Sequence, residues 1–189
     1  MLRKTLLAAL CANAVLTLAT PAAAAQTQRA KSEEGTLEVI TVVKGLEHPW
    51  ALAFLPDQQG MLVTERPGNL RLVGPDGQLS APLRGVPKVW AKGQGGLLDV
   101  VLSPDFKQDR TVYLSYSEVG EDGKAGTAVG RGQLSQDLKR LNSFNVIFRQ
   151  QPKLSKGNHF GSRLVFDRDG YLFITLGENN DRPTAQDLD

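Results

Sequence analysis

The chain has 189 residues and a formal net charge of +2 at neutral pH, and its basic residues are spread along the sequence without a block. This distribution argues against a nucleic-acid-binding protein. The single cysteine, Cys11, lies in the N-terminal segment, so the rest of the chain predicts no disulfide, no catalytic thiol and no cysteine-bound zinc.

Residues 1–25 have the three-part layout of a secretory signal peptide. Arg3 and Lys4 supply positive charge, an apolar run follows, and Ala23-Ala24-Ala25 fits the A-x-A cleavage rule. The alternative is an anchoring helix, but the run is short for a membrane span, so we expect no membrane span in the mature chain. An exported protein without disulfides fits the bacterial periplasm, which is the predicted location. Residues 26–36 are rich in Gln, Lys and Glu and predict a disordered leader.

A sequence pattern recurs from residue 50 onward: an apolar strand, a turn that contains Asp, and a second apolar strand. It occurs at residues 50–65, 98–116 and 163–176. The third copy turns through Asp-Gly between β-branched and aromatic runs, which is the strongest hairpin signal in the chain. A further strand is expected at residues 69–73. The glycine-rich residues 117–130 predict a surface loop.

The spacing of the copies is that of propeller blades: 48 residues separate Asp57 from Asp105, and 64 separate Asp105 from Asp169. A blade of four antiparallel strands takes about 40 to 50 residues. The sequence therefore predicts an all-β fold, a six-bladed β-propeller of which residues 37–189 supply about three blades as a truncated N-terminal part. A β-sandwich is the alternative, but it gives no reason for one hairpin pattern to repeat at this interval. Three blades do not close a ring.

Two glycine-flanked loops that lead into the second and third copies hold the candidate site residues. His159 directly precedes the third copy, where an imidazole could act as a general base near neutral pH. Gln94 has the matching place before the second copy, and its amide could both donate to and accept from a planar polar ligand. The alternatives are a structural histidine and a turn in which the amide caps its own backbone.

Three further polar side chains have structural interpretations. His48, at the entry to the first copy, is expected to be packed or to face solvent. Glu65 and Glu178 end their strands in equivalent places, and both are expected to accept hydrogen bonds at a blade edge rather than to catalyse. The sequence contains no G-x-S-x-G elbow and no H-E-x-x-H spacing, and no metal ligand is predicted within it.

Three separated motifs resemble those of the soluble quinoprotein sugar dehydrogenases. They are His-Pro-Trp-Ala-Leu-Ala-Phe at 48–54, Gly-Gln-Gly-Gly-Leu-Leu-Asp-Val at 93–100 and Asn-His-Phe-Gly-Ser-Arg-Leu at 158–164. The likeness extends from about Leu37 to the end of the chain and is greatest to the periplasmic aldose sugar dehydrogenase branch. It implies a six-bladed propeller that binds pyrroloquinoline quinone (PQQ) at the top of its channel, together with calcium.

The resemblance also implies the chemistry. His159 would take the proton from the C1 hydroxyl of an aldose while hydride passes to the quinone, which yields the lactone, and an external electron acceptor would reoxidise the cofactor. Gln94 would contact the cofactor. Asn158 would contact the sugar at a position where glucose-oxidising relatives carry Asp, so their substrate preference is not carried over. The calcium ligands and the basic partners of the quinone carboxylates are expected beyond Asp189, and the fragment alone is therefore expected to be inactive.

Two other functions stay open on the sequence. A calcium-dependent propeller lactonase or hydrolase would need a cage of carboxylates and Asn in the channel, whereas these loops offer His and Gln. A non-catalytic binding propeller is the third possibility, because a fold does not fix a function.

Overall fold

The computed structural model describes residues 27–186, so the expected signal peptide lies outside the described residues. Residues up to Thr41 and residues from Val42 onward form two separate units. In the first unit, β1 (Thr27–Ser32) pairs with β2 (Gly35–Ile40) in an antiparallel hairpin whose residues are all exposed. The structure thus differs from the disordered leader expected over residues 26–36. Pairing with β2, which contains Leu, Val and Ile, satisfies the backbone groups of the polar first strand although no core covers it.

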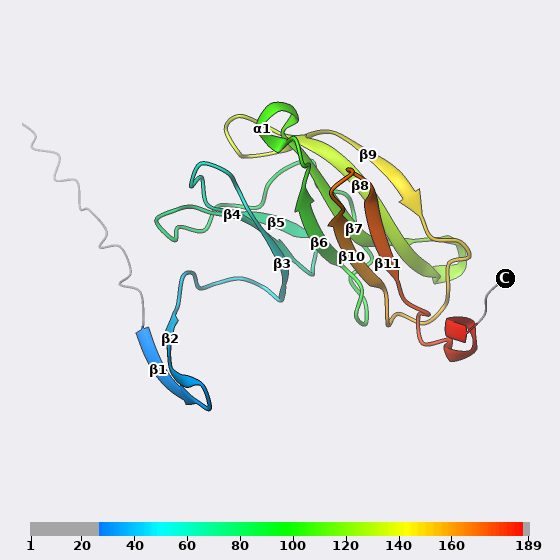
Figure 1. The fold of residues 1–189 in the computed structure, drawn as a ribbon. Helices are drawn as coiled ribbons and strands as arrows, with labels where there is room; N and C mark the ends of the chain where they lie inside the picture. Colours follow the sequence, from blue (N-terminus) through cyan, green and yellow to red (C-terminus); the bar gives the residue numbers. More distant parts are fainter. Residues whose placement is uncertain (1–26, 187–189) are drawn as a thin grey trace, which may run out of the picture. The chain divides into compact units, whose positions relative to one another are not determined.

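Three antiparallel sheets follow one another in the second unit (Figure 1). All three hairpins predicted from the repeated pattern are present, and so is the strand predicted at residues 69–73. The first sheet contains β3 (Pro49–Phe54), β4 (Met61–Glu65) and β5 (Asn69–Val73); the second contains β6 (Leu97–Leu102), β7 (Thr111–Val119), β8 (Ala125–Leu134) and β9 (Leu141–Arg149); the third contains β10 (Gly161–Phe166) and β11 (Leu172–Leu176).

The turn between β10 and β11 shows how local chemistry closes a hairpin. Asp167 Oδ1 accepts hydrogen bonds from the backbone N–H groups of Asp169 and Tyr171, at 3.0 and 2.8 Å. Gly170 has a φ of +86°, which glycine adopts without steric cost. The Asp-Gly signal in the sequence therefore corresponds to the turn that it predicted.

The surface loop predicted over residues 117–130 is wrong. Strand β7 continues to Val119 and β8 begins at Ala125, so only a short turn around η1 (Glu121–Gly123) separates them. Gly123 lies in this turn with a φ of +72°, whereas Gly130 makes room for packing between strands. A Cβ on Gly130 would lie 2.4 Å from the Phe144 ring of the adjacent strand β9.

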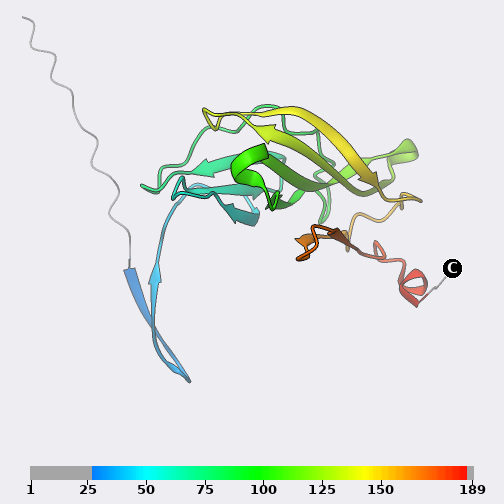
Figure 2. The ribbon, with the colours of Figure 1, turned by 45° about the horizontal axis from the view of Figure 1, so that its top comes forward.

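The sheets meet through their first strands, as neighbouring propeller blades do. Strand β6 contacts β3 on one side and β10 on the other, and Figure 2 shows the green and yellow second sheet between the cyan first sheet and the orange third sheet. A core of buried apolar side chains joins the first two sheets, including Leu62, Leu70, Leu97 and Leu114. This sequence of adjacent sheets fits a propeller and not two sheets stacked face to face.

Helical structure among the described residues is limited to α1 (Phe106–Asp109), η1 and η2 (Arg182–Gln186). Within residues 27–186, no helix is both long enough and apolar enough to cross a membrane.

Candidate active site

The loops that lead into β6 and β10 are joined by two reciprocal hydrogen bonds. The backbone N–H of Gln94 donates to Gly157 O at 2.8 Å, and the backbone N–H of His159 donates to the side-chain Oε1 of Gln94 at 2.9 Å. Gln94 and His159 are 65 positions apart in the sequence. The structure therefore brings together the two side chains that sequence analysis selected, and Gln94 caps the neighbouring loop rather than its own backbone.

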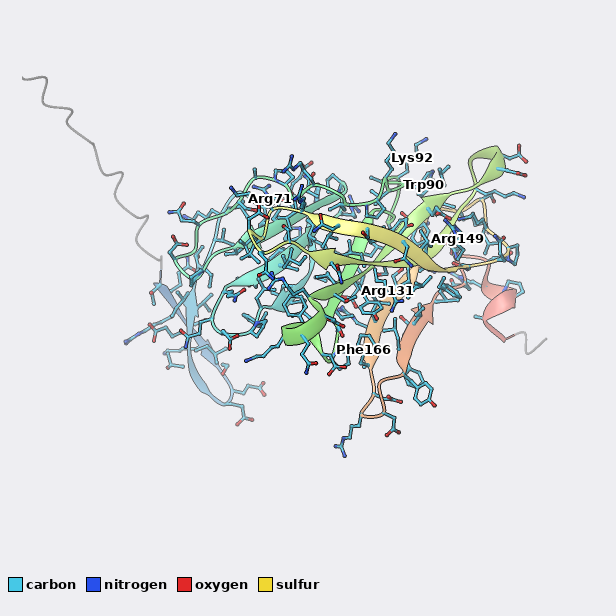
Figure 3. The ribbon with its side chains drawn as sticks, turned by 90° about the horizontal axis from the view of Figure 1, so that it is seen from above. Arg71, Trp90, Lys92, Arg131, Arg149 and Phe166 are labelled. Atoms are coloured by element: carbon cyan, nitrogen blue, oxygen red, sulfur yellow. The ribbon has the colours of Figure 1, made fainter. Side chains whose placement is uncertain are left out.

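Glycine permits the close approach of these loops. A Cβ on Gly93, whose φ is +56°, would lie 2.4 Å from Gly157 O. A Cβ on Gly157 would lie 2.4 Å from the Trp90 ring. In Figure 3, Trp90 and Lys92 lie on the same stretch of chain, and Lys92 extends away from the body of the molecule. The two loops thus pack backbone to backbone beside an indole ring.

The imidazole of His159 is held by a carboxylate from the end of the third sheet. Its Nδ1 lies 2.5 Å from Glu178 Oε1, in the loop that follows β11. The hydrogen bond from His159 lowers the pKa of Glu178, so this group is a carboxylate and can only accept. Nδ1 therefore carries the proton, and Nε2 of the half-exposed ring is the nitrogen left to accept a proton from a ligand.

The sequence analysis missed the partner of Glu178, which is His159. The sequence places Glu65 and Glu178 at equivalent strand ends and predicts the same structural role for both. Glu65 confirms that prediction: it is fully buried and accepts hydrogen bonds from Glu47 N and Asn69 Nδ2, at 2.8 and 3.0 Å. For Glu178 the prediction of an edge acceptor is incomplete, because its acceptor oxygen faces His159. No local motif distinguishes the two carboxylates.

The two remaining residues that the sequence analysis discussed are Asn158 and His48. Asn158 is half-buried, and its Oδ1 lies 3.5 Å from the point that a Cβ on Gly93 would occupy. It therefore lines the same pair of loops as Gln94 and His159. His48 has a φ of +48° and accepts a hydrogen bond from Arg66 N through its backbone oxygen, which fits the structural role predicted for it.

Basic side chains surround the two loops. Arg66 Nη1 donates to Gly93 O at 3.1 Å, and Lys156 Nζ donates to Asn180 O at 3.0 Å. Lys92 lies between Arg66 and Lys156 in the sequence, and its side chain is exposed. Together with the amide donors of Gln94, these cations suit a planar ligand that carries carboxylates. Residues 27–186 contain no group of three or more His, Cys, Asp or Glu side chains placed to hold a metal ion.

The fold is that of a propeller protein. Its candidate ligand site is a histidine with a carboxylate partner, joined to the amide side chain of Gln94 through loops that lead into adjacent sheets. The sequence matches the model of the Glucose / Sorbosone dehydrogenase family over residues 46–189, and the chain belongs to this family. The solved structures that it resembles are propeller dehydrogenases, and this chain supplies about three blades of that all-β fold.

Three relatives show how far the similarity reaches. The chain is 68% identical over 154 residues to the aldose sugar dehydrogenase YliI of Escherichia coli (strain K12), a match that covers 82% of this chain and 42% of that protein. The apo-form crystal structure of the soluble aldose sugar dehydrogenase from Escherichia coli has 71% identity and a TM-score of 0.74, over 76% of this chain and 41% of that chain. The PQQ-bound form of aldose sugar dehydrogenase from Streptomyces coelicolor has 28% identity and a TM-score of 0.65, over 89% and 46%. This chain thus spans less than half the length of these relatives.

Proposed function

We propose that this chain contributes the proton-accepting part of the active site in a PQQ-dependent aldose dehydrogenase, which oxidises the C1 hydroxyl of an aldose to the lactone. The observation that carries the proposal is the hydrogen bond between His159 and Glu178, beside the loop of Gln94. The family match supports sugar oxidation. The relative from Streptomyces coelicolor, solved in its PQQ-bound form, supports the choice of cofactor.

His159 acts as the general base in this proposal. Its Nε2 accepts the proton of the C1 hydroxyl as the O–H bond breaks, and the ring becomes imidazolium. The carboxylate of Glu178 stabilises that positive charge from Nδ1 and keeps the ring oriented. The quinone, when bound, would supply the acceptor for the hydride that leaves C1. The sugar then loses two electrons and two protons in all, one proton to His159 and the other within the hydride.

Gln94 and the surrounding cations would hold the quinone. The Oε1 of Gln94 is occupied by His159 N–H, so its two Nε2 hydrogens are the donors available to a quinone oxygen. Arg66, Lys92 and Lys156 would add positive charge that attracts an anionic cofactor to these loops, in addition to the basic partners of its carboxylates that the resemblance implies elsewhere in the full-length protein. Asn158 would contact the sugar from the same loop as His159. Calcium is expected as a second cofactor of the full-length protein, and no role in the reaction is assigned to it here.

The proposal also includes the location of the protein and the reoxidation of the quinone. Residues 1–25 would direct export to the periplasm, and an external electron acceptor would reoxidise the reduced quinone. The occupied carboxylate of Glu178 favours the dehydrogenase over the lactonase alternative, because a metal-dependent hydrolase needs carboxylates that are free to bind the ion, whereas this one binds the histidine.

Two variants of the full-length protein, reconstituted with PQQ and calcium, test the proposal. His159→Ala should lower kcat for aldose oxidation by about 10²- to 10⁴-fold, the usual contribution of a general base. It should change the Kd for PQQ by at most about fivefold, because one neutral contact contributes about 1 kcal/mol. Quinone titration by fluorescence and steady-state kinetics give the two values.

Gln94→Glu is the matched variant. It keeps an oxygen to accept from His159 N–H but replaces the amide donors by a negative charge, so it should weaken PQQ binding and spare kcat at saturating quinone. Near-normal turnover of His159→Ala at saturating quinone and sugar would show that His159 is not the base.

A further inference from the structure

The segment that carries His159 has an unfavourable backbone conformation. φ is +51° at His159 and +73° at Ser162, and neither residue has the freedom of glycine. Such conformations persist only where neighbouring groups hold them. A bulge between Gly161 and Leu164 also interrupts the pairing of β10 with β11. The strand ladder therefore does not determine the backbone of the residues in between.

Buried hydroxyl groups of the neighbouring sheet hold this segment. Thr127 Oγ1, on β8, donates to Phe160 O at 2.8 Å, and Ser115 Oγ, on β7, donates to Ser162 O at 2.6 Å. Thr127 and Ser115 are fully buried. Two consecutive strands of the second sheet thus fix carbonyl groups one and three residues after His159.

Asp99, on β6, extends the same network. Its Oδ2 accepts from Leu164 N at 2.7 Å, and its Oδ1 accepts from Arg163 Nη1 at 2.9 Å. The backbone N–H of Asp99 donates to Ser115 Oγ at 2.9 Å, which links this carboxylate to the hydroxyl that holds Ser162. Asp99 is 1% exposed. Because the groups are desolvated, loss of one partner leaves another unsatisfied.

We propose that Thr127, Ser115 and Asp99 are positioning residues for His159. They hold the backbone of this segment, in which His159 and Ser162 have left-handed conformations, and this backbone directs the imidazole toward Glu178. Thr127 has the most direct effect, since the carbonyl that it holds belongs to the next residue, Phe160. The inference rests on the proposed role of His159 as the base. It means that residues of the second blade orient a base on the loop that leads into the third blade.

The test removes the hydroxyl of Thr127 without changing the shape of the side chain. In the full-length protein with PQQ bound, Thr127→Val should lower kcat by about 10- to 100-fold, the range expected when a reacting group moves by about 1 Å. It should also shift or abolish the downfield proton NMR signal of the His159 Nδ1–H, assigned by its absence in His159→Ala. Thr127→Ser, which keeps the hydroxyl, should retain both.

Thr64→Val is the matched control. Thr64 is equally buried and donates to Leu98 O across the first and second sheets at 2.6 Å, so it loses the same kind of bond away from His159. Its kcat and Nδ1–H signal should stay unchanged. Ser115→Ala provides a second variant should Thr127→Val fail to fold, with the same expected results.

The two proposals fail in different ways. An unchanged Nδ1–H signal in Thr127→Val, or equal losses in Thr127→Val and Thr64→Val, would overturn the positioning role. A lost signal in Thr127→Val combined with full turnover of His159→Ala would support the positioning role and overturn the catalytic one.

Discussion

The hydrogen bond between His159 and Glu178 gives the two nitrogens of the imidazole different roles. Nδ1 is held by a carboxylate on the loop after β11, while Nε2 of the half-exposed ring is left for a ligand. The hydrogen bond from His159 keeps the pKa of Glu178 low. The carboxylate therefore remains ionised across the pH range in which a histidine base would work.

Glu178→Gln is expected to lower kcat by roughly 10- to 100-fold, a part of the general-base contribution. The expected loss arises because the imidazolium that forms when His159 takes the proton no longer faces a negative charge. Steady-state kinetics at saturating quinone and sugar would measure it.

Glu118→Gln is the control for that substitution. Glu118 forms ion pairs with Arg149 and Lys153, at 2.9 and 2.7 Å, and not with His159. Its removal should leave kcat unchanged. An unchanged kcat in Glu178→Gln would contradict the role given to this carboxylate.

At the scale of elements, the site depends on how closely two loops approach. Rigid strands on either side hold the loops, while glycines at positions 93 and 157 remove the side chains that would separate them. The Trp90 ring lies against Gly157 and also packs against Phe160, with ring centroids 6.1 Å apart. The indole thus packs against the loop that carries His159.

Gly157→Ala is expected to destabilise the protein by about 1–3 kcal/mol and to raise the Kd for PQQ, because the added methyl group overlaps the Trp90 ring. Gly157→Ala/Trp90→Phe removes part of the indole and should recover some affinity. Urea unfolding and quinone titration would measure the two quantities.

Gly126→Ala offers a comparison on strand β8, where the atom nearest to the added Cβ belongs to the flexible Lys153 side chain, at 3.2 Å, and Gln150 lies at ordinary contact distances of 3.5 and 3.6 Å. We expect it to leave PQQ binding unchanged. Equal effects of Gly126→Ala and Gly157→Ala on quinone affinity would contradict the packing argument.

At the scale of the whole molecule, the outer sheets leave apolar side chains uncovered. On β3, Leu52 and Phe54 are 51% and 73% exposed, and on β10 and β11, Val165 and Phe173 are 52% and 59% exposed. Large side chains of this kind normally pack against a neighbouring blade in a propeller. These two surfaces therefore lie where further blades would pack.

Residues 26–189 expressed alone are expected to bind the dye ANS, to self-associate, and to unfold without a sharp transition, because both surfaces stay in contact with water. Fluorescence, light scattering and thermal unfolding would check this, with the full-length protein as the reference. Sharp, cooperative unfolding of a monomeric fragment would contradict the expectation.

The hairpins and the blade spacing follow from the sequence alone, because turn chemistry and alternating apolar residues act locally. The glycines beside His159 and Gln94 were enough to predict both as site residues. The sequence did not predict that residues 117–130 continue two strands, since Gly130 is required by the packing of Phe144 on another strand. The partners of Glu178, Thr127 and Asp99 also became visible only in the folded structure. Each of these side chains acts on a residue of a different strand or loop, and hydrogen bonds between such distant positions arise only when the sheets pack side by side.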